Sequence, residues 1–258
     1  MTATRRRLWV VAGLATWALV LGALAVLSHR TDEPTVREQR TLTQALRVVK
    51  ESVGHTVSQA GADTVPVISP LSIDTGCRIT PMRSGATATG VVRFFTSDPD
   101  LLRRLADGYP SAYQATVSTD GRTMRADAGE FVAVRGKLVA PGEVQVTATT
   151  GCRPADAEIQ YPPPDTTVEP VRILTALGAT SVEPALTGVA RCPAGGPAST
   201  VSASGRITAP PADAGTLDQG RQVLANDKVY AYRRGADEAV AVVPTGEHDV
   251  RVYVTKLC

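Results

Sequence analysis

Aromatic residues are scarce in this chain, since Phe, Trp and Tyr together make up 4% of its 258 residues. Cores built from large rings are therefore excluded. Ala, Val and Thr are plentiful, which favours cores of small and β-branched side chains, and these suit strands. Lysine is also rare, with four residues among the 27 basic ones, a bias that we associate with GC-rich bacterial genomes. The length is sufficient for two domains of ordinary size.

A concentrated basic surface is missing as well. The formal charge is +2, but residues 1–30 hold four arginines and no acids, so the rest of the chain carries about −2. A protein that binds phosphate backbones would show a basic stripe, and none follows residue 30. We therefore exclude nucleic acid as a partner.

Motifs of known catalytic chemistry are absent. No G-x-S-x-G, S-x-x-K or H-E-x-x-H occurs. No C-x-x-C occurs either, and the cysteines and histidines are widely separated, so we expect no metal and no cofactor. Two carboxylate pairs, Asp98 with Asp100 and Asp237 with Glu238, are explained more simply by a helix start and a turn. We expect a protein that is not an enzyme, with a cell-envelope hydrolase using an unidentified carboxylate pair as an alternative.

The longest uncharged run covers residues 8–27. At 1.5 Å per helical residue it reaches about 30 Å, the thickness of a hydrocarbon core. Arg5, Arg6 and Arg7 precede it directly, so the positive-inside rule places residues 1–7 in the cytoplasm. The sequence thus predicts a single-pass signal anchor in the lipid bilayer, with everything that follows it outside the cytoplasm.

A cleaved signal peptide is the alternative explanation of this run. An A-x-A pattern ends at Ala25, and cleavage near it would give a secreted protein. The small residues Ala15, Ala18, Gly22 and Ala25 also line one side of the predicted helix, where a second helix could approach closely. A homodimer is therefore an option that the sequence leaves open.

Residues 28–62 are expected to contain a juxtamembrane helix. Leu42, Leu46, Val49 and Val53 recur in it at spacings of four, three and four, which is typical of an amphipathic helix. Two heptads are too few to define a coiled coil. We expect this helix to pack on the first domain, with a dimeric stalk as the alternative.

A proline-rich linker is expected at residues 155–170, because consecutive prolines at 162–164 stiffen the chain and cannot donate to a sheet. The linker separates a first domain at residues 63–154 from a second at residues 171–258.

The two halves of the chain end alike. Residues 142–152 read GEVQVTATTGC and residues 248–258 read HDVRVYVTKLC, and they align without a gap. Upstream, EFVAV at residues 130–134 matches EAVAV at residues 238–242, and a weaker match joins the two leading edges around Pro70 and Pro184. These matches predict an internal repeat.

Within each half the dominant period is two, which indicates strands. A short helix is expected in the first half between Asp98, as N-cap, and Gly108, and a second helix around residues 213–225. The predicted fold is mainly β, or alternatively α+β, with two tandem, related antiparallel-sheet domains. The predicted strands cover residues 87–95, 113–119, 122–127, 131–135, 143–150, 199–208, 228–233, 238–243 and 249–256.

Four cysteines allow three pairings, and a duplication in which each copy closes itself selects one of them. We therefore expect disulfides between Cys77 and Cys152 and between Cys192 and Cys258. Each would close a loop of roughly 70 residues, for which the chain-entropy model gives about 4 to 5 kcal/mol.

Tyr230, Tyr232 and Tyr253 lie on predicted strands of the second domain and are candidates for a ligand or partner patch, although packing in the core or on the sheet face explains them more simply. From these features we expect a non-catalytic, membrane-anchored binding or structural module of the bacterial cell envelope. Its expected partner is another envelope protein or a cell-wall component. A regulatory or assembly subunit of a membrane complex is the alternative.

Overall fold

A computed structural model describes residues 3–31, 40–156, 168–207 and 220–258. The chain divides into two compact units, Met1–Thr35 and Val36–Cys258. The first unit holds one helix, α1 (Ala3–Thr31). Its segment Trp9–Leu27, with a mean hydropathy of 2.4, is long and apolar enough to cross a membrane. This confirms an apolar N-terminal helix of the kind found in membrane anchors and signal sequences.

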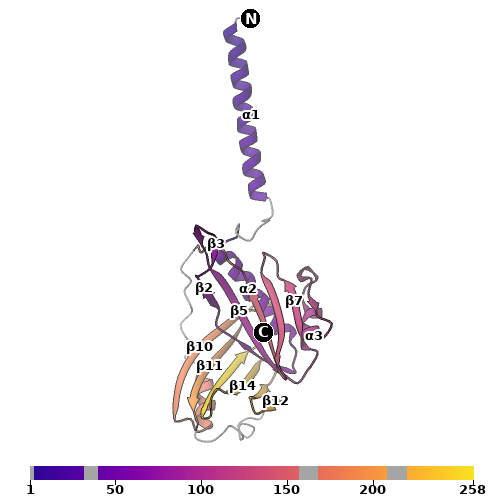
Figure 1. Ribbon diagram of the computed structural model, residues 1–258, viewed down its shortest axis with the longest axis vertical. Coiled ribbons are helices and arrows are strands. Elements are labelled where there is room, and N and C mark those ends of the chain that lie inside the picture. The colour runs from indigo at the N-terminus through magenta and orange to yellow at the C-terminus, as the bar shows by residue number, and fades with distance from the viewer. Residues whose placement is uncertain (1–2, 32–39, 157–167, 208–219) are drawn as a thin grey trace. The chain divides into compact units, whose positions relative to one another are not determined.

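The second unit contains two antiparallel sheets (Figure 1), which confirms the predicted fold class. A short pair of strands, β3 (Arg78–Thr80) and β4 (Arg83–Ser84), lies outside both sheets. The strands of the first sheet are β1 (Thr64–Ile68), β2 (Ser72–Asp74), β5 (Thr87–Thr96), β6 (Thr116–Val117), β7 (Thr123–Asp127), β8 (Ala133–Ala140) and β9 (Glu143–Thr149). Those of the second are β10 (Ser181–Arg191), β11 (Pro197–Arg206), β12 (Arg221–Asn226), β13 (Val229–Arg234), β14 (Glu238–Pro244) and β15 (Asp249–Lys256).

The two sheets have the same strand order. It is β1-β5-β9-β8-β7-β6 in the first, with β2 also paired to β5, and β10-β11-β15-β14-β13-β12 in the second. Thr89 lies opposite Thr149 in the first sheet, as Thr200 lies opposite Thr255 in the second. From these two pairs, each position of one sheet can be matched to a position of the other.

The strand register shifts the upstream sequence match by two residues. Val134 pairs with Ala148, and Val240 pairs with Val254. Because the ungapped match of the last strands equates Ala148 with Val254, the counterpart of Val134 is Val240 rather than Val242.

The first strand of each sheet is interrupted at the same place. β1 pairs with β5 as far as Ile68, and pairing resumes in β2 at Ser72. In the second sheet the register of β10 shifts between Pro184 and Thr187. The weak match of the leading edges falls on these two interruptions.

Helix α2 (Leu42–Gln59) packs on both sheets. Its buried Val49 belongs to one core cluster with Phe94 of the first sheet and Ala190 of the second. The apolar side of the predicted juxtamembrane helix is thus covered within the chain, and by more than the first domain alone. Three shorter helices also lie within the described residues: α3 (Leu101–Gly108), a 3₁₀ turn (Ser111–Tyr113) and α4 (Val168–Ala176).

Several sequence expectations differ from the structure. Strands β1, β10 and β12 were not predicted, and the strand expected at residues 113–119 is reduced to β6. Helix α3 begins at Leu101, and Asp100 rather than Asp98 occupies its N-cap without a side-chain bond. The helix predicted around residues 213–225 lies partly outside the described residues, and its remainder forms β12.

Candidate binding surface

Strand β1 is an edge strand whose free edge is bound by the second sheet. It pairs with β5 on one side only, yet all five of its residues are buried. Its outward backbone groups are satisfied by side chains of the second sheet: Arg233 donates to the carbonyl of Thr64, and Thr255 donates to the carbonyl of Pro66 at 2.7 Å. Pro66 has no N–H to offer, which suits a free edge. β1 therefore lies across one face of the second sheet.

A relay of hydroxyl groups fixes this crossing. The Ile68 amide donates to Thr200 Oγ1 at 2.8 Å, and the hydroxyls of Thr200 and Thr255 lie 2.8 Å apart. Because the Thr255 proton goes to the Pro66 carbonyl, Thr200 must donate to Thr255. Both threonines are at least 98% buried, so the relay supplies the bonds that water gives an ordinary edge strand.

Small apolar side chains surround the relay on the second sheet. Ala231, Ala239 and Ala241 are fully buried and form one cluster with Val67 of β1 and Phe95 of β5. Alanine leaves room for a crossing strand to approach the sheet closely. The second sheet thus has a buried face on which β1 is bound by two hydroxyl groups and packs against three alanines.

The matching face of the first sheet is open. Thr89 and Thr149 occupy the positions of Thr200 and Thr255, but both are only half-buried. A groove of about 440 Å³ runs over this face, lined by residues of β5, β7, β8 and β9. It carries four threonines, one glutamine and three basic side chains, namely Arg125, Arg135 and Lys137.

The basic residues stand where the second sheet has small apolar ones. Arg125 lies opposite Arg135, as Ala231 lies opposite Ala241. Lys137, two residues beyond Arg135, corresponds to a valine. Two cations therefore replace two fully buried alanines, which explains why one face is closed by a strand and the other is solvated.

The three cations of the groove repel one another. Directly opposite side chains have Cβ atoms about 5 Å apart, and like charges in that arrangement destabilise a sheet. Arg125, Arg135 and Lys137 are all exposed, and none of them forms a salt bridge with a carboxylate in the part of the chain that the structure describes. The groove is therefore a positively charged surface available to an anion.

Two carboxylates on the same face, Glu143 and Asp127, are bonded to other groups. Glu143 pairs with Arg93 at 3.6 Å, where Arg93 also donates to the Tyr253 hydroxyl of the second sheet. Asp127 accepts a bond from the Gly129 amide at 2.9 Å. The acids thus border the groove and leave its three cations uncompensated.

The structure divides the three candidate tyrosines between both faces of the second sheet. Tyr230 and Tyr232 lie on one face with ring centroids 5.4 Å apart, and Tyr232 is buried. Tyr253 lies on the opposite face, because its neighbour Val254 shares a face with Tyr232 through Val240. There Tyr253 contacts the first sheet through Arg93.

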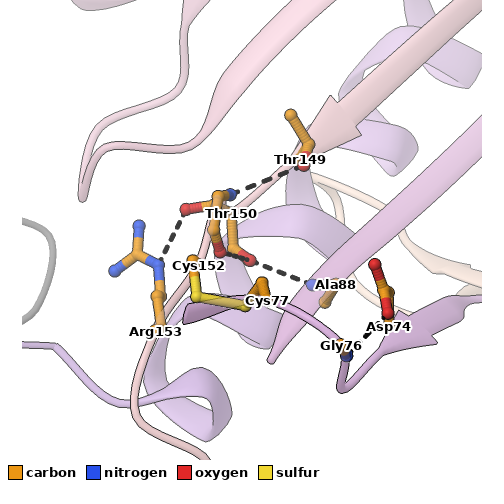
Figure 2. The surroundings of a disulfide bond; sticks show 9 residues. Asp74, Gly76, Cys77, Ala88, Thr149, Thr150, Cys152 and Arg153 are labelled. Atoms are coloured by element: carbon orange, nitrogen blue, oxygen red, sulfur yellow. Dashed lines mark hydrogen bonds between the residues drawn. A yellow bond between two sulfur atoms is a disulfide. The ribbon is translucent and has the colours of Figure 1, made fainter. Parts of the chain in front are cut away.

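Both predicted disulfides are present. Cys77 is bonded to Cys152 with a Cα–Cα distance of 5.8 Å, and Cys192 to Cys258 with 5.4 Å. Figure 2 shows the first bond beside Thr150, whose hydroxyl accepts from the Ala88 amide at 3.0 Å. Each bond ties the end of the last strand of a sheet to the segment that follows its first strand.

Arg153, next to the first disulfide, is fully buried although it is charged. Its Nε donates to the Thr150 carbonyl at 3.0 Å (Figure 2), and its guanidinium also donates to the Glu130 carbonyl. The second bond holds the carbonyl of Glu130, the first of two consecutive residues with left-handed backbone, Glu130 and Phe131, at φ 51° and 57°. The role of Arg153 is therefore structural.

One carboxylate of each pair considered from sequence forms a close ion pair with an arginine. Asp98 Oδ2 lies 2.5 Å from Arg104 Nη1, and Glu238 Oε1 lies 2.5 Å from Arg234 Nη2. Among the described residues, no group of His, Cys, Asp and Glu side chains is placed to hold a metal ion. Arg5, Arg6 and Arg7 fall in the first turns of α1.

Comparison of the chain with protein-family models, with curated proteins and with solved structures gives no significant match. The groove was missed by sequence reasoning because it depends on strand register. Arg125 and Arg135 belong to predicted strands, but only the pairing of β7 with β8 shows that they face each other.

Proposed function

We propose that this chain is a membrane-tethered, extracytoplasmic, non-catalytic binding module of the bacterial cell envelope, and that it binds its partner on the open face of the first sheet. The observation that carries the proposal is the groove with three uncompensated cations on a sheet braced by a disulfide. The apolar helix α1 supports tethering. Two disulfides support an oxidising compartment, since such bonds are rare in the cytosol.

A second part of the proposal is that the two sheets arose by duplication. The identical strand order, the matched threonine pairs and the interruption of both first strands support it. One copy then uses its face to bind the edge of the other, and the remaining face is left for a partner.

The other functions that the sequence left open have less support. A stalk that dimerises through α2 would need the side of the helix that is buried against both sheets. A hydrolase would need two facing carboxylates, whereas Asp98 and Glu238 each lie against an arginine.

Topology is tested by adding protease to intact protoplasts that produce the full chain with a C-terminal epitope. Loss of the epitope while α1 stays in the membrane fraction is the expected result. An epitope that resists protease until the cells are lysed would contradict the extracytoplasmic location. Release of the whole epitope-bearing chain into the medium would show a cleaved signal sequence instead of an anchor.

Binding is tested by photo-crosslinking in the same cells. Benzoylphenylalanine replaces Thr147, which lies opposite Arg135 in the centre of the open face. The control replaces Arg103, which is exposed on helix α3. A discrete crosslinked species is expected from position 147 only. Identical patterns from both positions would refute this face as the binding surface.

A further inference from the structure

The open face of the first sheet corresponds to the face of the second sheet that is covered by β1. On the second sheet, the matched positions hold β1, an extended segment of five residues, by its backbone. Thr89 stands where Thr200 accepts from the Ile68 amide of that segment, and Thr149 stands where Thr255 donates to its Pro66 carbonyl. The first sheet thus offers the same pair of hydroxyls to a crossing chain.

We infer that this face binds an extended, acidic segment of a partner protein, laid across the strands as β1 is laid across the second sheet. The inference rests on the proposed function and specifies its ligand. The threonine pair would bond to the backbone of the segment. Arg125 and Arg135 would bind its carboxylates, because a guanidinium matches a carboxylate with two parallel hydrogen bonds.

The size of the groove fixes the length of the segment. The groove spans four strands in the order β5, β9, β8 and β7. Neighbouring strands are about 4.8 Å apart and an extended chain rises about 3.3 Å per residue, so about five residues cross the face. Side chains alternate along such a segment, so every second residue faces the sheet. Two acidic residues separated by one other residue would therefore suffice.

Charge favours this ligand over a second strand of the β1 type. The segment β1 is Thr-Val-Pro-Val-Ile and binds to alanines. A similar apolar segment on the first sheet would bury Arg125 and Arg135 without counter-ions, which is costly. Asp127 also occupies the position of Arg233, so a ligand carbonyl would find no guanidinium at that end. Arg125 of β7 and Arg135 of β8 lie opposite each other, so the acidic side chains are expected over this pair and away from Asp127.

The experiment measures fluorescence anisotropy of a labelled eight-residue peptide of alternating valine and glutamate with the full chain in detergent micelles. A peptide with glutamine in place of glutamate is the matched ligand control, and polyphosphate is a competitor without a peptide backbone. We expect binding of the glutamate peptide and at least roughly tenfold weaker binding of the glutamine peptide, which corresponds to about 1.4 kcal/mol.

Protein variants separate the two kinds of contact. Arg125→Ala and Arg135→Ala should each weaken peptide binding roughly tenfold, whereas Arg103→Ala, on helix α3, should leave it unchanged. The double variant Thr89→Val, Thr149→Val should weaken peptide binding several-fold and leave polyphosphate binding unchanged. All these side chains are exposed or half-buried, and circular dichroism confirms that each variant is folded.

Three outcomes would overturn the inference. The first is that the glutamate and glutamine peptides bind equally well, or that neither peptide binds. The second is that polyphosphate displaces the peptide and that the Thr89→Val, Thr149→Val variant binds the peptide as tightly as the wild type. This result would assign the face to an anionic polymer. The third is salt-sensitive self-association of the full chain that Arg135→Ala abolishes, which would assign it to a second copy. A crosslink from position 147 without peptide binding would leave the proposed function standing and refute this ligand alone.

Discussion

Replacing Thr255 by valine should break the junction between the two sheets. Valine has nearly the shape of threonine, so no cavity forms, but the Thr255 hydroxyl is lost. The Pro66 carbonyl then lacks its donor and the Thr200 hydroxyl lacks its acceptor, both in a buried site. An unsatisfied buried group costs about 1 to 3 kcal/mol, so we expect the loss of two such bonds to lower the free energy of unfolding by about 2 to 6 kcal/mol.

Thr149→Val is the matched control, because Thr149 is the counterpart of Thr255 on the open face. Its hydroxyl is half-exposed and makes only a 3.5 Å contact with the Gly151 amide, so its loss should change stability by no more than about 0.5 kcal/mol. Guanidinium unfolding of a fragment of residues 36–258, with both disulfides intact, measures both variants. Hydrogen exchange at the Ile68 amide provides a local measurement and should accelerate only in Thr255→Val. Equal stabilities of the two variants would refute the relay.

Three further predictions concern other parts of the fold. Burial raises the pKa of Tyr109 to about 12. Because the folded state favours the neutral form of this side chain, the free energy of unfolding should fall by about 2 to 3 kcal/mol between pH 10 and 12. Unfolding curves of the Tyr109→Phe variant should not show this loss. Bonds from Arg172, and then from Arg234, lower the pKa of Glu169 to about 2. Glu169→Gln should therefore cost about 1 kcal/mol at pH 7 after solvent screening, and this difference from wild type should vanish as the pH falls through 4.5 towards 2. Gly54→Ala should lower the melting temperature, because its Cβ would lie only 1.8 Å from the Arg191 carbonyl oxygen and overpacking costs about 1 to 3 kcal/mol; an unchanged melting temperature would contradict the close packing of α2 on β10.

The sequence predicted β5, β7 and β9 well because each of these strands has one buried and one more accessible face. β9 alternates along its whole length, and it begins at the predicted residue. The segment β1 could not be recognised in this way, because the second sheet covers it and no alternation remains. Its proline is compatible with a strand only at a free edge or a bulge. Burial that comes from a distant sheet leaves no local pattern.

The disulfides were predictable for a different reason. Their pairing followed from the repeat and not from geometry, so matched ends at Cys152 and Cys258 were enough. The candidate surface was not predictable, because it depends on which residues of β7 and β8 lie opposite each other. A shift of one residue would turn Arg125 and Arg135 to the other face, and the sequence alone does not fix that register.

The contrast between the two faces also explains how one architecture can serve two purposes. The alanines Ala231 and Ala241 are buried against β1, and the Thr200–Thr255 relay with Arg233 supplies the polar contacts of the same junction. Arg125 and Arg135 keep the corresponding face of the first sheet solvated. The free-energy cost of burying two cations exceeds the gain from burying an apolar strand. The acidic segment inferred for this face would supply the carboxylates that balance these charges. The same strand geometry is thus made structural in one sheet and selective in the other by the exchange of two small side chains for two charged ones.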